Sequence, residues 1–268
     1  MRAGLPDGAE VDYDLQGDGP VVAFVHPGLW DRRTWDPQVP TFTAAGFRVL
    51  RHDLRGYGRS SRPVAGERFA HWEDLVAVLD HAGVERAALV GCSIGGGAAI
   101  EAAIARPDRV WALVPVAPGL AGLESTAEDE AWYEEHAPNY DELLAAGDLE
   151  AVQDLELGVW APLGTDDPAG SLIKAIAREN IHTLAMDSSG EVHLDPAAAG
   201  RLGSITAATL VVEAQHDPPD MRRIIELLAD QIPGARRVTI AADHVVNLRR
   251  PEAFDAEVIP FLQEHAPR

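Results

Sequence analysis

The residues of this 268-residue chain that are best placed for chemistry begin with a serine between two glycines. The segment Gly91-Cys92-Ser93-Ile94-Gly95 fits the pattern G-x-S-x-G, after an apolar strand-like run and before an alanine-rich helical pattern. A serine on such a turn is strained, its hydroxyl stands above the sheet edge, and the helix points N–H groups toward developing negative charge. The alternative is an incidental serine in a glycine-rich turn, but the flanking strand and helix favour Ser93 as a nucleophile.

A candidate acid and a candidate base stand later in the chain, each just after a predicted strand. Asp217 follows the strand predicted at 209–213, and His244 follows the strand predicted at 237–240. Reactive side chains at the carboxyl ends of parallel strands meet at one edge of a sheet. A histidine can take the serine proton and later return it to a leaving group, while an aspartate fixes the histidine tautomer and stabilises the imidazolium. The positions therefore predict a triad of Ser93, His244 and Asp217.

Other residues of the same chemical types lie close to the proposed triad. His216 and Asp243 are each adjacent to one of its members, and we expect them to be a loop residue and a turn former. Cys92 is expected to point into the core as a small apolar side chain rather than to act as a thiol nucleophile. His26 is expected to tie loops together rather than to serve as a second base.

The elements that position these residues alternate between strand and helix. Short apolar and β-branched runs predict strands at residues 21–25, 47–52, 87–91, 110–116, 209–213 and 237–240. Helical spacing of apolar residues predicts helices at 69–83, from 94 to the stop at Pro107, at 221–231 and at 251–264. We therefore expect an α/β fold with a mostly parallel central sheet flanked by helices.

This alternation breaks in the middle of the chain. Residues 120–203 contain several helical stretches and no convincing strand. We expect this segment to be a helical cap (lid) inserted into an α/β core that consists of residues 1–119 and 204–268. Because the insertion falls between the nucleophile and the acid, it is expected to set substrate specificity.

Aromatic residues in the expected cap and in the loop after the first predicted strand indicate where a substrate could bind. Ligand pockets favour domain interfaces and aromatic walls. We therefore expect substrate contacts from Leu29 and from at least one of Trp30, Trp132 and Trp160. The alternative for most of these rings is that they pack the cap onto the sheet.

Composition and charge limit the classes of partner. The net charge of −21 repels phosphate backbones and anionic membranes, and an anionic substrate would need a local arginine. With one cysteine, the chain can hold neither an internal disulfide nor a cysteine-rich zinc site, and the histidines show no metal-ligand spacing, so no metal or cofactor is expected. The sequence shows no signal-peptide core and no membrane-spanning run. We expect a soluble cytoplasmic protein that acts on a small molecule, with no nucleic-acid or membrane partner and its oligomeric state left open.

Three further motifs carry a resemblance to a known family. They are His26-Pro27-Gly28-Leu29, similar to an H-G-x oxyanion loop, residues 53–60, similar to a D-x-R-G-x-G-x-S turn, and residues 244–254, similar to a histidine segment. With the serine motif, they make the chain resemble the α/β-hydrolase superfamily over essentially its whole length. Within it, Trp35-Asp36-Pro37-Gln38 and the glycines around Ser93 look most like 3-oxoadipate enol-lactonase-type proteins. The resemblance implies the α/β-hydrolase fold and an oxyanion hole.

The oxyanion loop departs from the family pattern at one position. The usual H-G dipeptide is His26-Pro27 here, with glycine one place later. Aligning the histidines puts the oxyanion donor at the Gly28 amide, and a shift by one residue puts it at the Leu29 amide. Proline has no N–H to donate. The second donor is expected to be the Ile94 amide, directly after the nucleophile.

Together these features predict a serine hydrolase that cleaves a small carboxylic ester or lactone through an acyl-Ser93 intermediate. Family dehalogenases and epoxide hydrolases use an aspartate at the serine position, so Ser93 points away from their chemistry. Three alternatives on the same fold stay open. They are hydrolysis of a C–C bond in a vinylogous diketone, perhydrolysis with peroxide, and a weakly catalytic ligand receptor.

Overall fold

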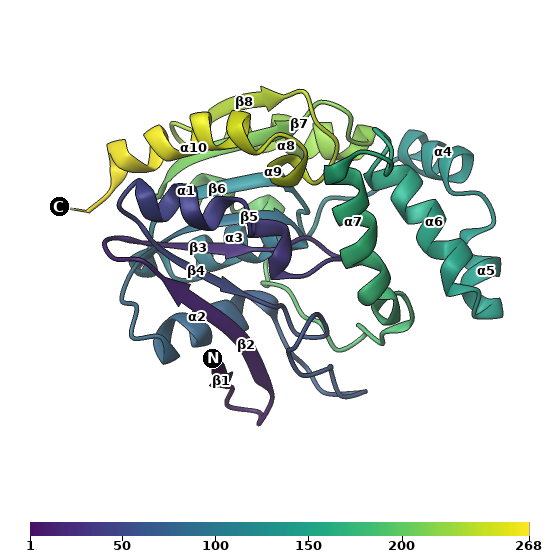
Figure 1. The fold of residues 1–268 in the computed structure, drawn as a ribbon, viewed down its shortest axis with the longest axis horizontal. Coiled ribbons are helices and arrows are strands. Elements are labelled where there is room, and N and C mark those ends of the chain that lie inside the picture. The colour runs from purple at the N-terminus through teal and green to yellow at the C-terminus, as the bar shows by residue number, and fades with distance from the viewer. Residues whose placement is uncertain (268) are drawn as a thin grey trace.

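The centre of the molecule is an eight-stranded sheet, seen in a computed structural model that describes residues 1–267 (Figure 1). The strands are β1 (Arg2–Gly4), β2 (Glu10–Gln16), β3 (Val21–Val25), β4 (Arg48–His52), β5 (Ala87–Ser93), β6 (Val110–Pro118), β7 (Ala208–Ala214) and β8 (Arg236–Ile240). Their order across the sheet is β1-β2-β4-β3-β5-β6-β7-β8. Strands β3 to β8 run parallel, whereas β1 and β2 pair antiparallel at one edge.

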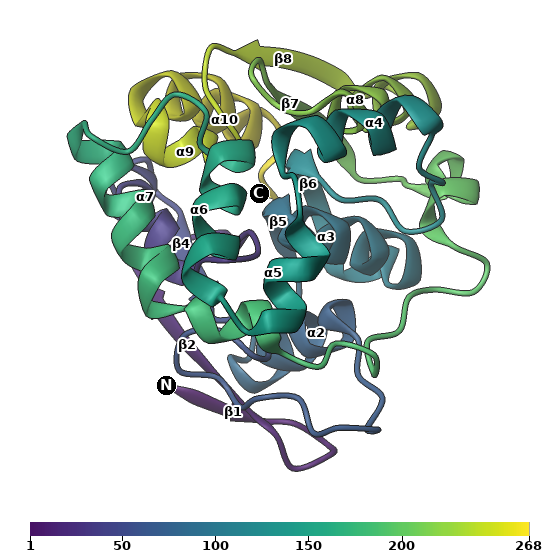
Figure 2. The same ribbon diagram turned by 90° about the vertical axis from the view of Figure 1, so that its right-hand side faces the viewer.

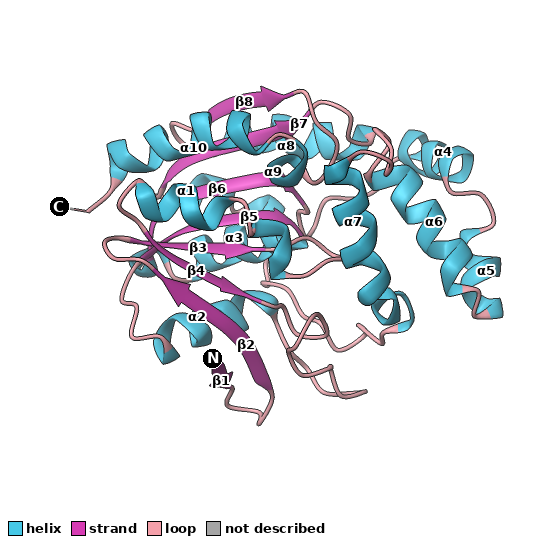
Figure 3. Ribbon diagram, viewed as in Figure 1, coloured by secondary structure: helices cyan, strands magenta, loops and turns pink. Residues whose placement is uncertain are grey.

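Helices cover both faces of this sheet (Figure 3). One face carries α1 (Gln38–Ala44) and α10 (Pro251–His265), preceded by the short α9 (Val246–Arg249) (Figure 1). The other face carries α2 (His71–His81), α3 (Ile94–Ala105) and α8 (Pro219–Gln231). Every residue of β3 and β6 is buried, as expected for parallel strands with helices on both sides.

The six predicted strands correspond to β3–β8, so the predicted α/β class with a mostly parallel sheet is confirmed. Apolar runs do not reveal β2, because Glu10, Asp12 and Asp14 alternate with its apolar residues near the sheet edge. Strands β5 and β6 each continue two residues beyond the predicted ends. The extension matters for the site, because it pairs Ser93 with Pro118 at the carboxyl end of the sheet.

Residues 120–203, which we call the cap segment, contain four α-helices that lie over the carboxyl ends of the strands (Figure 2). They are α4 (Ala127–His136), α5 (Tyr140–Ala146), α6 (Leu149–Trp160) and α7 (Pro168–Glu179). Three of them begin at a side chain that accepts a backbone N–H, namely Thr126, Asp148 and Asp167. Such caps supply partners to amides that a helix cannot pair internally. Local sequence therefore specifies where these helices start.

A small apolar cluster joins the cap segment to the core. It contains Trp30 from the loop after β3 together with residues in or next to α6, α7 and α9: Leu157, Ala161, Ile173, Ile176, Ala177, Val245, Leu248. Trp30 is only 1% exposed, and its indole N–H donates to the Ile173 carbonyl at 2.9 Å. This expected substrate contact thus fills the interface between cap segment and core.

Glycines around Ser93 let three elements approach closely. A Cβ atom at Gly95 would lie 2.5 Å from the carbonyl oxygens of Val25 and His26, and one at Gly96 would lie 2.6 Å from Pro118 Cβ. A Cβ at Gly91 would overlap the Gly95 carbonyl. The start of α3 is therefore packed backbone to backbone against the ends of β3 and β5.

We expect Gly95→Ala to destabilise the protein by about 1–3 kcal/mol, because the added methyl group meets main-chain oxygens that cannot move aside. Gly158→Ala is the matched control, since Gly158 lies within α6 with no atom within 4 Å of its would-be Cβ. That change should stabilise the protein by about 0.5–1 kcal/mol through helix propensity. Urea unfolding of both variants measures the difference, and equal midpoints would contradict the packing argument.

Candidate active site

Ser93 occupies a backbone conformation that non-glycine residues rarely adopt. It is the last residue of β5 and directly precedes α3, with φ 53° and ψ −121°. Its carbonyl oxygen accepts a hydrogen bond from the Gly119 amide at 2.9 Å, and its side chain is partly exposed. The sharp turn and the start of α3 hold the hydroxyl at the carboxyl end of the sheet, as the G-x-S-x-G motif predicts.

Asp217 and His244 meet after β7 and β8. The imidazole Nδ1 lies 3.1 Å from each carboxylate oxygen of Asp217, and the two residues are 6% and 2% exposed. When Nδ1–H donates to the carboxylate, Nε2 is left as the proton acceptor. The structure thus pairs the predicted acid and base.

His244, the candidate base, contacts the serine turn through its main-chain carbonyl. The Cys92 thiol donates to the His244 carbonyl at 3.4 Å, so His244 packs directly against the residue before the serine. Within residues 1–267, Ser93 Oγ makes no hydrogen bond to His244 Nε2. Such contacts are often long in unliganded active sites and tighten with substrate. Cys92 itself is fully buried, and burial raises the pKa of its thiol well above the ordinary value.

Asp243 and His216 have surroundings unlike those of Asp217 and His244. Asp243 is fully buried, and its carboxylate accepts from the Arg249 guanidinium at 2.6 Å. Arg249 also donates to Asp167 Oδ1 at 3.0 Å and to the Gly164 carbonyl at 2.9 Å in the cap segment. His216 is exposed. Asp243 therefore anchors the segment that carries His244.

His26 holds the loop that contains the candidate oxyanion donors. Its Nε2 accepts from the Leu54 amide at 2.8 Å, so Nδ1 carries the proton and donates to the Pro27 carbonyl at 2.8 Å. Burial lowers the pKa of this imidazole, because the charged form would lose its hydration. A neutral His26 thus ties two loops together.

The Gly28 and Leu29 amides are both free to donate to a ligand. Among residues 1–267, neither amide donates to another residue. Leu29 adopts φ 66°, and a Cβ built on Gly28 would lie 3.7 Å from Ile94 Cδ1 and 3.6 Å from Tyr57 Oη. Gly28 therefore lies beside Ile94, the other expected donor.

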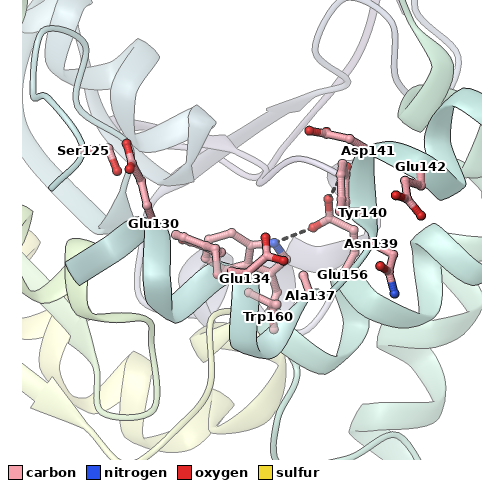
Figure 4. Close-up of a pocket in the computed structure, with 12 residues that line it drawn as sticks. Ser125, Glu130, Glu134, Ala137, Asn139, Tyr140, Asp141, Glu142, Glu156 and Trp160 are labelled. Carbon is pink, nitrogen blue, oxygen red and sulfur yellow. Dashed lines mark hydrogen bonds between the residues drawn. The ribbon is translucent and has the colours of Figure 1, made fainter. Parts of the chain in front are cut away.

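A cavity of about 580 Å³ opens between α4, α5 and α6 (Figure 4). Its wall, which we call the cap cavity lining, consists of Ser125, Glu130, Tyr133, Glu134, Ala137, Asn139, Tyr140, Asp141, Glu142, Glu156, Val159 and Trp160. Five of these residues are acidic and none is basic. Ser93, Asp217 and His244 are not part of this lining, but Trp160 is, and its indole centroid lies 4.4 Å from that of the His244 ring.

Trp132 and Trp160, the two tryptophans of the cap segment that were candidates for substrate contact, have different surroundings. Trp160 lines the cavity beside His244, whereas Trp132 lies outside the lining and stacks on His136, with ring centroids 3.9 Å apart. Sequence reasoning missed Glu156, which accepts from the Trp160 indole N–H at 2.6 Å. Its spacing of four residues from Trp160 within a predicted helical region is the signal that points to such a pair.

The described residues form neither a metal-ligand cluster nor a membrane-spanning helix. Across residues 1–267, no three His, Cys, Asp or Glu side chains are grouped in a way that could hold a metal ion. None of the helices in that range is both long and apolar enough to cross a membrane.

The chain belongs to the alpha/beta hydrolase fold family, whose profile matches residues 20–251. This confirms the family resemblance and the fold that it implies. A hydrolase from Pseudomonas aeruginosa PA01 superposes with a TM-score of 0.79 at 30% identity, covering 98% of this chain and 97% of its own. A solved N-acyl homoserine lactone degrading enzyme gives a TM-score of 0.76 at 28% identity over 97% of this chain and 100% of its own.

Among curated relatives, a bifunctional esterase/perhydrolase from Acinetobacter calcoaceticus is 40% identical over 94 residues, which is 34% of each chain. The chain thus matches about a third of the length of the first curated relatives. The narrower resemblance to 3-oxoadipate enol-lactonase-type proteins stays a prediction.

We expect Arg249→Met to destabilise the protein by about 3–5 kcal/mol, because it leaves the Asp243 carboxylate buried without its cation. Arg236→Met is the control, because Arg236 pairs with Glu264 where both side chains are about half exposed. Thermal and urea unfolding should show a large loss for Arg249→Met and little change for Arg236→Met. A small loss at Arg249 would show that Asp243 is not held as described.

Proposed function

We propose that this protein is a serine hydrolase that cleaves a small carboxylic ester or lactone through an acyl-Ser93 intermediate. The observation that carries the proposal is the buried His244–Asp217 pair, which stands at the same end of the sheet as the strained turn at Ser93. Relatives named as an esterase/perhydrolase and a lactone-degrading enzyme support the same reaction class.

In the proposed mechanism, His244 Nε2 takes the proton of Ser93 as Oγ attacks the acyl carbon of the substrate. The amides of Gly28 and Ile94 stabilise the oxyanion, each contributing about 3–4 kcal/mol in the transition state. The C–O bond to the leaving group then breaks, and the imidazolium returns its proton to the departing alkoxide. Asp217 stabilises the imidazolium throughout. A water molecule, deprotonated by His244, attacks the acyl-enzyme in the same way and releases the carboxylic acid.

Perhydrolysis is a second candidate because the Acinetobacter calcoaceticus relative is named an esterase/perhydrolase. It uses the same acyl-Ser93 intermediate. Hydrogen peroxide then replaces water as the attacking nucleophile, and the product is a peracid. The two reactions differ only in the acceptor, so the same three residues would serve both.

The cap cavity favours substrates without a negative charge. Its lining holds five carboxylates and no arginine, lysine or histidine. A carboxylate on the substrate would be repelled there, and the repulsion is moderated by water because four of the five acidic residues are exposed. We therefore assign the cap cavity to the uncharged or cationic part of an ester or lactone, with Trp160 and Tyr133 as apolar walls.

Covalent labelling tests the nucleophile. A fluorophosphonate probe should label the wild-type protein at Ser93, and Ser93→Ala should abolish labelling without loss of the folded state. Asp217→Asn should lower turnover of a reactive ester on the order of 10⁴-fold, because the imidazole then takes the wrong tautomer. Asp243→Asn does not test the acid of the triad, because the Asp243 carboxylate binds Arg249 and its loss would act through that ion pair. A folded wild type that is neither labelled nor active on esters would refute the proposal.

Two esters of equal acyl length test the charge preference. We expect kcat/KM for 4-nitrophenyl butyrate to exceed that for 4-nitrophenyl hemisuccinate by about threefold or more, because the acidic lining would repel the succinyl carboxylate. Raising the salt concentration should shrink the ratio, since ions screen the repulsion. Equal kcat/KM values for the two esters would show that the acyl group does not bind in the cap cavity.

A further inference from the structure

Trp160, the last residue of α6, contacts His244 through both its main chain and its side chain. The Trp160 carbonyl accepts a hydrogen bond from the His244 amide at 3.2 Å. The indole and imidazole rings have centroids 4.4 Å apart and planes tilted by 44°. A residue of the cap segment therefore touches the candidate base directly.

The Trp160 indole is itself held in place from within the cap segment. Its N–H donates to Glu156 Oε2 at 2.6 Å, and the Tyr140 hydroxyl donates to Glu156 Oε1 at 2.7 Å (Figure 4). Glu156 lies one helical turn before Trp160 on α6. Hydrogen bonds to an ionised acceptor are shorter and stronger than those between neutral groups. The indole cannot rotate away from His244 without breaking such a bond.

An imidazole that acts as a base must be held in more than one direction. Asp217 holds His244 at its Nδ1 edge, with both carboxylate oxygens 3.1 Å away. A ring held at one edge can still tilt by small rotations about the Cα–Cβ and Cβ–Cγ bonds of the side chain. An aromatic face packed against the imidazole restricts that tilt, and an electron-rich ring also favours the imidazolium that forms when the base accepts a proton.

We propose that Trp160, anchored by Glu156, is a positioning residue that holds His244 in the orientation in which it accepts the Ser93 proton. This inference rests on the function proposed above. It assigns to the cap segment a part in the rate of the chemical step, in addition to the binding of substrate. Glu156 contributes by fixing the indole and does not touch the reacting atoms.

Substitutions of Trp160 separate the aromatic face from the indole N–H. Trp160→Leu removes the face, whereas Trp160→Phe keeps an aromatic face without the N–H. The readouts are the rate of Ser93 labelling by a small fluorophosphonate, and kcat and KM for 4-nitrophenyl acetate, an ester with a short acyl group. Trp160→Leu should lower the labelling rate and kcat about tenfold while KM changes less than about threefold, and Trp160→Phe should recover most of the loss.

The anchor is tested by Glu156→Gln, which keeps every aromatic side chain and exchanges a carboxylate acceptor for a neutral amide oxygen. We expect labelling to slow by about two- to fivefold, because the weaker hydrogen bonds let the indole move. Glu150→Gln is the matched control, since Glu150 lies exposed on the same helix. Its labelling rate should equal that of the wild type.

The outcomes distinguish this inference from the proposed function. A folded wild type that the probe does not label refutes the proposed function and the inference with it. A labelled wild type with an equally fast Trp160→Leu variant refutes the positioning role alone, as does a change confined to KM or an equal loss in the Leu and Phe variants. If circular dichroism shows that Trp160→Leu does not fold, Glu156→Gln decides: a wild-type labelling rate overturns the inference.

Discussion

The turn at Ser93 is the constraint on which the rest of the site depends. A non-glycine residue at φ 53° costs about 1–3 kcal/mol of strain, so the surrounding structure must hold it there. It does so because Gly91 and Gly95 allow main-chain contacts that any side chain would block, and because the Gly119 amide binds the Ser93 carbonyl. The same contacts seat the first turn of α3 against the end of β3, which is why Ile94 lies beside the loop that contains Gly28.

The segment that carries His244 is held from two sides. Asp243 binds Arg249 within the segment, and Arg249 binds Asp167 and the Gly164 carbonyl of the cap segment. Trp160 adds a main-chain hydrogen bond to His244. Because these contacts come from the cap segment as well as from the core, a displacement of the cap segment would also disturb the candidate base.

Local patterns in the sequence predict the six parallel strands and four of the helices that flank them, but they predict neither the antiparallel strands β1 and β2 nor the long-range contacts. The strand before Ser93 and the helix after it are encoded by neighbouring residues, and so is the position of Asp217 and His244 after strands. Which aromatic ring faces His244 is not local: Trp30 and Trp160 have similar chemistry, yet Trp30 fills the apolar cluster and Trp160 lines the cavity. Likewise, only the fold brings Asp167 of the cap segment to Arg249, which already holds the buried Asp243.

Helix α6 both lines the cap cavity and contacts the candidate base. Glu156 and Trp160 belong to the cap cavity lining, and Trp160 also contacts the candidate base while Glu156 holds the Trp160 indole N–H. A change that reshapes the cavity at either residue therefore also alters the surroundings of His244, so specificity and rate are coupled along this helix. By contrast, Glu130 and Glu134 of α4 line the cavity and, within residues 1–267, form no hydrogen bond or ion pair with Trp160 or His244. Changes of substrate preference that preserve rate should therefore arise more readily on α4 than on α6, because only α6 is tied to the base.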